Sequence, residues 1–176
     1  DSVFWGTNVQ RLLDVTYDFT KDLVVVVGQF QGELRYDSLG EQTLTAVSAK
    51  DHILARFDPG LSYVDKVIFN GSIKQTTVKN INNCVIADTV NSYYATGDLV
   101  GDLFDASSTL LVSADDATNM DILVLRVDDQ LVYQWGRTGG GTSFEHINSS
   151  GSDAFGNVYF TGKAQSASIV IDSTAS

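Results

Sequence analysis

Asp153-Ala-Phe-Gly-Asn-Val-Tyr-Phe-Thr-Gly162 is the stretch that decides the fold, because two earlier segments of the chain follow the same pattern. These are Asp18-Phe-Thr-Lys-Asp-Leu-Val-Val-Val-Val-Gly28 and Asp88-Thr-Val-Asn-Ser-Tyr-Tyr-Ala-Thr-Gly97. Each segment starts with an aspartate, passes through a short turn, continues with four or five strand-forming residues and ends in glycine. The closing glycines stand 69 and 65 residues apart, and regular spacing of this kind indicates an internal repeat.

Further landmarks recur with nearly the same period. Gly32-Glu33-Leu34 stands four residues after the first closing glycine, and Gly101-Asp102-Leu103 stands four residues after the second. Asp51–Asp58 matches Asp121–Asp128 at an offset of 70, which aligns Arg56 with Arg126. Either these arginines bridge to carboxylates at strand ends, or they are exposed charges on the rim. The last landmark, spaced by 65, consists of Trp5-Gly6, Asn70-Gly71 and Trp135-Gly136.

The local patterns predict strands throughout. Short runs of β-branched and aromatic residues alternate with Gly, Asn, Asp and Ser, and no stretch has sustained helical periodicity. Only residues 107–117 leave room for a helical turn. One period holds about four expected strands, around Val24, Leu34, Leu54 and Val67, with long loops at 38–50 and 107–119. Four antiparallel strands per repeat form one blade of a β-propeller, so we expect an all-β fold of such blades.

The third copy carries a family resemblance. The Asp, the Gly-Asn turn and the Val-Tyr-Phe-Thr-Gly strand of 153–162, with Trp135 ahead of Gly139-Gly140-Gly141, resemble the SBBP-type β-propeller repeat. The match is strongest over 121–162, whereas the earlier copies replace Gly-Asn with Lys21-Asp22 and Asn91-Ser92. The resemblance implies a propeller fold in an extracytoplasmic or cell-surface protein, and a scaffold without catalytic residues. We interpret the three glycines as a flexible turn.

The number of repeats predicts an incomplete propeller. Residues 1–176 form a single propeller segment, with repeats at roughly 1–64, 65–130 and 131–176, of which the last is incomplete. Closed propellers have about 4 to 8 blades, and about two and a half are present here. An open arc exposes apolar blade faces and strand edges. We therefore expect the chain to be part of a longer protein or to close by oligomerising.

The composition limits the possible partners. The formal net charge is −11, which repels phosphate backbones and anionic lipids, so we expect no nucleic-acid binding. The longest apolar run is far too short to cross a bilayer, so we expect no membrane insertion. Cys84 is the only cysteine, so the chain has no internal disulfide, and we interpret the thiol as a small core residue.

The residues that could carry chemistry are sparse. His52 and His146 are the only histidines, too few for a zinc site, and we expect both at the surface. No Gly-x-Ser-x-Gly elbow and no phosphate-binding loop occur, so we predict no enzyme activity and no cofactor. Calcium is the one metal with candidate ligands, although no complete calcium-loop motif is present. These ligands are Asp98, Asp102, Asp105, Asp115-Asp116 and Asp128-Asp129.

The sequence therefore predicts a structural or adhesion module, extracellular or on the cell surface. Such a module binds a protein or glycan partner, or packs into a larger assembly. Asn70-Gly71-Ser72 and Asn148-Ser149-Ser150 are candidate N-glycosylation sites, as in a glycoprotein. The alternative is a carbohydrate-binding lectin, in which aromatic side chains stack on sugars, although burial in the core is their default. The candidate aromatic residues are Trp5, Tyr93, Tyr94, Trp135 and Tyr159.

Overall fold

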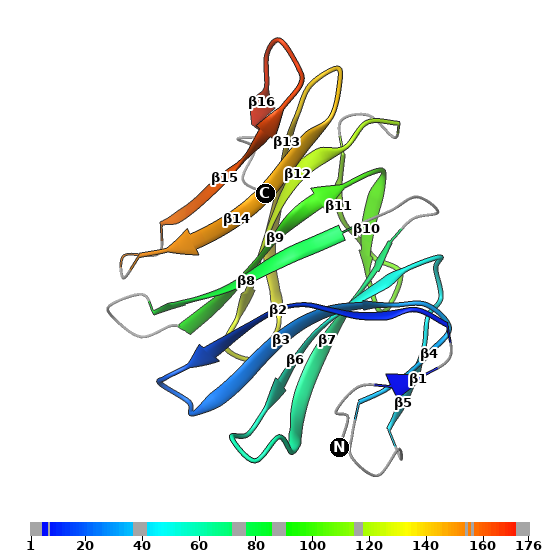
Figure 1. The fold of residues 1–176 in the computed structure, drawn as a ribbon, viewed down its shortest axis with the longest axis vertical. Helices are drawn as coiled ribbons and strands as arrows, with labels where there is room; N and C mark the ends of the chain where they lie inside the picture. Colours follow the sequence, from blue (N-terminus) through cyan, green and yellow to red (C-terminus); the bar gives the residue numbers. More distant parts are fainter. Residues whose placement is uncertain are drawn as a thin grey trace.

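The computed structural model describes residues 5–6, 8–36, 42–71, 77–85, 91–114, 118–153, 155 and 157–171, with only the backbone at 5, 77–85 and 91. All of the regular structure in these residues is β-strand, which confirms the all-β prediction. The strands form antiparallel sheets, and none of these sheets is closed. Figure 1 shows them as twisted layers arranged one beyond the other.

Two four-stranded meanders follow one another along the chain. In the first, β2 (Gln10–Asp18), β3 (Leu23–Phe30), β6 (Asp51–Phe57) and β7 (Tyr63–Gly71) pair in that order. In the second, β8 (Thr77–Val85), β9 (Asn91–Leu99), β12 (Asp121–Asp128) and β13 (Tyr133–Gly140) pair in the same way. A third unit begins with the hairpin of β14 (Glu145–Ser152) and β15 (Val158–Ala164). We call these the first, second and third repeats.

Short strands form further pairings beyond the meanders. A hairpin of β4 (Glu33–Arg35) and β5 (Thr43–Thr45) leaves the first repeat, and one of β10 (Asp102–Asp105) and β11 (Leu110–Ser113) leaves the second. β10 pairs with β7, β4 pairs with β1 (Trp5–Gly6), and β16 (Val170–Ile171) pairs with β13. In the residues that the structure describes, each full period therefore holds six strands rather than the expected four.

The regions predicted to be long loops contain these extra strands. β5 lies within 38–50, and β11 lies within 107–119, where the described residues form a turn and a strand instead of a helical turn. The prediction also missed β2, β8 and β14, because their polar residues obscure the alternation expected of a strand.

The register revises one of the repeat landmarks. Gly6 pairs with Leu34, Gly71 with Leu103 and Gly140 with Val170, so these three glycines occupy equivalent positions. The landmark containing Trp135-Gly136 was therefore aligned four residues too early. Gly139 and Gly140 are buried in β13, and the interpretation of the glycine triplet as a flexible turn is wrong for these two residues.

Aspartate-led turns connect many of the strands. The Asp58 carboxylate accepts the Ser62 amide, and Leu61 between them has a positive φ of 64°. Asp128 repeats this arrangement 70 residues later, with Leu131 at φ 59°. A short side-chain acceptor stabilises such a turn because it satisfies amides that the ladder leaves unpaired. The same carboxylate-to-amide bonding, four residues on, occurs at Asp105 and Asp153.

The main core lies between the first and second repeats. Alternate residues of β3 face opposite sides of the sheet, so that Val25 and Val27 enter this core while Val26 enters a second core beneath the β4–β5 hairpin. Burial on both faces explains the unbroken valine run of β3. The main core consists of Val25, Val27, Leu54, Phe69, Tyr93, Ala95, Leu99, Leu103, Leu123, Leu125, Val127 and Leu131.

The first strands of the three repeats lie side by side. β8 lies between β2 and β14, and all three form one edge of their own sheets (Figure 1). The remaining strands of each repeat fan away from this row, with the last strand of each meander farthest out.

Candidate functional site

A buried polar network connects the first and second repeats. The Tyr93 hydroxyl on β9 donates a hydrogen bond of 2.5 Å to Oδ2 of Asp18 at the end of β2. Arg56 on β6 donates to the Tyr93 hydroxyl at 3.3 Å and to the Asp129 carbonyl at 2.6 Å. It also forms a bidentate ion pair with Asp65, of which the Nε bond is 2.6 Å. We call these five residues the junction network.

The network shifts the ionisation of its members. Burial raises the pKa of Asp18, but the hydrogen bonds from Thr20, Tyr93 and the turn amides outweigh it, so the pKa lies below 3.8. Burial and the hydrogen bond to Asp18 raise the pKa of Tyr93 well above 10.0. The hydrogen bond to Asp65 raises the pKa of Arg56. Asp18 thus stays an anion and Tyr93 a neutral donor at neutral pH.

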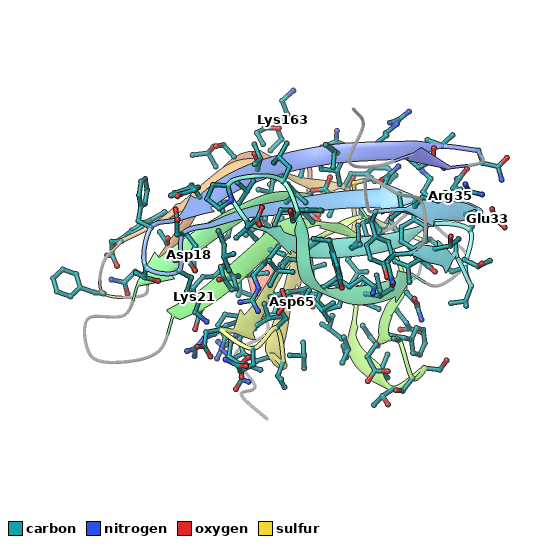
Figure 2. All side chains as sticks on the ribbon, turned by 90° about the horizontal axis from the view of Figure 1, so that it is seen from below. Asp18, Lys21, Glu33, Arg35, Asp65 and Lys163 are labelled. Carbon is teal, nitrogen blue, oxygen red and sulfur yellow. The ribbon has the colours of Figure 1, made fainter. Side chains whose placement is uncertain are left out.

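A second link spans the same junction at its surface. Lys21 Nζ donates to the carbonyl of Asp129 at 2.9 Å and to its carboxylate at 2.8 Å. This hydrogen bond lowers the pKa of Asp129. In Figure 2, Asp18 and Lys21 lie toward one end of the molecule, Glu33 and Arg35 lie at the other, and Asp65 lies nearer the middle. Arg126, at the position equivalent to Arg56, bonds to the Ser92 hydroxyl instead of a carboxylate.

A smaller network connects the second and third repeats. Asp98 on β9 is buried, and its carboxylate accepts the Ile147 amide at 2.9 Å and lies 2.8 Å from Nδ1 of His146. The hydroxyls of Thr96 and Ser150 are 2.7 Å apart between the same strands. His146 is partly exposed, and its contact with Asp98 holds it against the second repeat. His52 is fully buried in β6, so the expectation of a surface position is wrong for it.

The carboxylates considered for calcium have other contacts. Asp105 and Asp128 bond to the amides of their own turns, and Asp98 bonds to the third repeat. Within the described ranges, no three His, Cys, Asp or Glu side chains gather into a metal-binding group. Asp115-Asp116 lies outside those ranges, and the side chain of Cys84 is also not described. Calcium binding and an inert Cys84 stay untested hypotheses.

The candidate site is a groove between the second and third repeats, with a volume of about 590 Å³. One wall consists of residues from β9, β12 and β13, and the other comes from β15. Its lining is mainly apolar and aromatic, and the Arg137 guanidinium lies 5.5 Å from the Trp135 ring centre. We call it the Trp135 groove. The lining includes Tyr94, Val124, Trp135, Arg137, Val158 and Phe160.

The aromatic residues proposed for sugar binding are divided between core and groove. Tyr93 and Tyr94 are both buried, because β9 is covered on both faces. Trp135 is partly exposed and Tyr159 is 60% exposed, and both line the Trp135 groove. The structure describes only the backbone of Trp5, so its side chain cannot be assigned to either group.

The two candidate glycosylation sites differ in exposure. Asn148 lies on β14 and is exposed. Asn70 on β7 is only 7% exposed, and its side-chain amide donates to the Asp105 carbonyl at 3.0 Å. Of the two, Asn148 offers the more accessible amide nitrogen, and glycosylation of either residue stays a prediction.

The comparisons with protein-family models, curated proteins and solved structures found no match. Within the part of the chain that the structure describes, no helix is long and apolar enough to span a membrane.

Proposed function

We propose that this chain is a non-catalytic structural or adhesion module of β-propeller repeats, located outside the cell or on its surface. It binds protein or glycan partners, or packs into a larger assembly. One observation carries the proposal. The same joint occurs three times: β4, β10 and β16 each follow the second strand of a repeat, and they pair with β1, β7 and β13, respectively.

This pairing makes the unit extendable. Within the described residues, the same joint occurs at β1, at β7 and at β13. The row of first strands, β2, β8 and β14, supports the propeller arrangement, since blades place their first strands around a common axis (Figure 1). The resemblance of 153–162 to the SBBP repeat supports the same arrangement.

The use of charged groups supports a scaffold. Asp18 and Arg56 bond to Tyr93 and Asp129 of the second repeat, and Asp98 bonds to the third repeat, so these groups hold repeats together. Repeat proteins depend on such neighbour contacts because each unit buries little surface alone.

Location and adhesion can be tested on source cells. We expect Fab fragments against the folded chain to stain intact cells and to reduce their attachment to protein-coated or glycan-coated surfaces. Fab fragments raised against the denatured chain serve as the control. Staining that requires permeabilised cells would refute a surface location, and unchanged attachment would refute an adhesive role.

Mass spectrometry gives a second test of location for a eukaryotic source. We expect enzymatic deglycosylation to reduce the mass of the natively purified protein, and Asn148→Gln to abolish most of that change. An unchanged mass would remove the glycoprotein part of the proposal.

A lectin is the second candidate, because the partly exposed Trp135 and the exposed Tyr159 both line the Trp135 groove, together with Arg137. Aromatic rings stack on the apolar faces of sugars. A glycan array probed with the chain should then give hits that Trp135→Ala removes. An array without hits would refute this alternative.

A further inference from the structure

A second groove, with a volume of about 750 Å³, lies between the first and second repeats. Its lining comes from residues 66–69 of β7, from Leu44 of β5, from the β10–β11 hairpin and from Val132 and Tyr133 around the start of β13. We call it the Lys66 groove. Both repeats that line it contain all four strands of their meanders. The groove therefore belongs to a junction between two whole meanders.

The lining of the Lys66 groove is mainly apolar. Leu110 and Val132 are aliphatic but remain 53% and 55% exposed. Asp105, the carboxylate in the lining, accepts the amides of Ser107 and Thr109 at 2.8 Å each, so its charge is used within its own turn. Concave, mainly apolar surfaces with a few polar groups are typical of small-ligand sites. The apolar lining includes Leu44, Val67, Ile68, Leu110, Leu111 and Val132.

Lys66 brings a positive charge into this lining. Its Nζ donates hydrogen bonds to the Tyr36 hydroxyl at 2.8 Å and to the Tyr63 hydroxyl at 3.4 Å, and it lies 4.4 Å from the Tyr36 ring centre. Burial lowers the pKa of Lys66, but the bonds to the two tyrosines outweigh it, so the pKa lies above 10.5. Lys66 is therefore an ammonium ion at neutral pH.

This ammonium lacks an anionic partner in the part of the chain that the structure describes. Lys21 and Arg56 form ion pairs with carboxylates there, whereas Lys66 does not. An ammonium group has three donors, and the two tyrosine hydroxyls accept two of them. Buried or partly buried charges are normally paired, because taking an unpaired charge out of water is costly. The third donor and the uncompensated charge are thus available to an anion in the groove.

The second repeat shows that the fold does not require this lysine. Lys66 and Gly136 occupy equivalent positions in the strand register, as do Tyr63 and Tyr133. In the second repeat, the Tyr133 hydroxyl donates to the Leu111 carbonyl at 2.9 Å, so the backbone alone satisfies this tyrosine. The positive charge at Lys66 is therefore an addition to the repeat rather than a part of it, which favours a role in binding.

We propose that the Lys66 groove binds a small organic carboxylate with an apolar chain, such as a fatty acid. The carboxylate accepts a hydrogen bond from the Lys66 ammonium, and the chain lies against the aliphatic lining. One cation in the lining matches one negative charge. A phosphate group would carry more charge than Lys66 can neutralise, and the net charge of −11 would oppose its approach.

This inference goes beyond the proposed scaffold and does not depend on it. Because the lining comes from both repeats, a bound ligand would contact β7 of the first repeat and β11 of the second. A ligand that binds only the folded state stabilises it. The ligand would therefore also strengthen the junction between the two repeats.

The test is an NMR titration of the whole chain with octanoate and with 1-octanol, its neutral counterpart of the same chain length. We expect octanoate to bind one-to-one with a Kd on the order of 1 mM and to shift the amide signals of Val67, Ile68, Leu110 and Leu111. 1-Octanol should bind at least about fivefold more weakly, because it cannot form a charged hydrogen bond with the ammonium. Decanoate should bind about tenfold more tightly than octanoate, because two further methylenes are buried.

A lysine variant separates the charge from the apolar lining. Lys66→Met keeps an apolar stem and removes the ammonium, and we expect it to weaken octanoate binding at least about fivefold while leaving 1-octanol binding unchanged. Lys163→Met is the matched control, because this lysine is exposed on β15 outside the lining, and the change should leave both ligands unaffected.

A second variant keeps the test decisive if Lys66→Met disturbs the packing of the tyrosines. Val132 is 55% exposed, so Val132→Asp should leave the fold intact while placing a negative charge in the groove. We expect it to weaken octanoate binding at least about fivefold. Val47→Asp, at a side chain that is 75% exposed outside the lining, should leave binding intact.

Several results would overturn the inference. These are equal binding of octanoate and 1-octanol, octanoate binding that Lys66→Met and Val132→Asp both leave unchanged, and amide shifts confined to the Trp135 groove. Concentration-dependent shifts of the same amides without ligand would also overturn it, because a second copy of the chain would then cover the groove. None of these outcomes decides the scaffold proposal, which the Fab experiments test separately.

Discussion

Tyr93→Phe removes one hydroxyl from the junction network, and its cost can be worked out from the geometry. The hydroxyl donates to the buried Asp18 carboxylate at 2.5 Å. A hydrogen bond to a charged group contributes about 1.5–3 kcal/mol, and its loss leaves a buried anion with one donor fewer. We therefore expect the free energy of unfolding at neutral pH to fall by about 2 kcal/mol. For a chain of this size, the Tm should fall by roughly 4–8 °C.

The pH dependence of this loss separates a hydrogen bond to an anion from a packing effect. Asp18 has a pKa below 3.8 in the folded protein, so its contribution to stability is present above 3.8 and is lost as the pH falls through the folded pKa. Without the Tyr93 hydroxyl, the folded pKa lies closer to 3.8. The difference between the native chain and the variant should therefore shrink in acid.

The assay is urea unfolding followed by circular dichroism, at neutral pH and at about pH 3. Tyr133→Phe is the matched control, because the Tyr133 hydroxyl donates to the neutral carbonyl of Leu111 at 2.9 Å. Its loss should cost about 1 kcal/mol at both pH values. Equal losses for the two variants, or a Tyr93→Phe loss that stays constant in acid, would refute the reasoning.

Three further predictions concern other parts of the fold. Gly140→Ala should lower the free energy of unfolding in urea by about 2 kcal/mol, because the added methyl group would overlap a buried carboxylate. The control is Gly151→Ala, whose added methyl group would have no neighbouring heavy atom within 4 Å and should change stability by less than about 0.5 kcal/mol. Similar losses for the two variants would contradict this reasoning. Asp98→Asn should speed amide exchange in β14 about tenfold, and unchanged exchange would show that this carboxylate does not hold the third repeat. In an NMR titration, the Asp153 carboxyl should have its midpoint at about pH 2, because hydrogen bonds led by the Asn157 side-chain amide lower its pKa, and a midpoint at 3.8 would rule out that bonding.

Much of the fold was predictable, because its signals are local. The valine run of β3, the apolar run of β12 and the aspartate-led turns each carry their own signature. The extra strands were not predictable in this way. The sequence of β14 is mostly polar, and Ile147 is its only aliphatic residue. β5 is only three residues long, which is too short to show an alternating pattern. Such segments become strands because a neighbour supplies their hydrogen bonds.

The candidate site was only partly predictable. Trp135 and Tyr159 were identified as aromatic residues available for recognition, but the sequence placed Tyr93 and Tyr94 beside them without distinguishing core from groove. That distinction depends on which strand covers each face. Residues of β3 and β6 pack against the face of β9 that carries Tyr93, whereas β15 pairs with β14 alone among the described residues.

The sequence by itself determined the repeat, the strand content and the turns, because these depend on residues within a few positions of one another. Only the tertiary structure decided how the repeats join. The pairing of β7 with β10, the contact of Arg56 with Asp129 and the place of the Trp135 groove all involve residues far apart along the chain. Such contacts form because apolar faces from different repeats must be buried together. The register that buries them depends on two segments at once, so it cannot be predicted from the sequence of either segment alone.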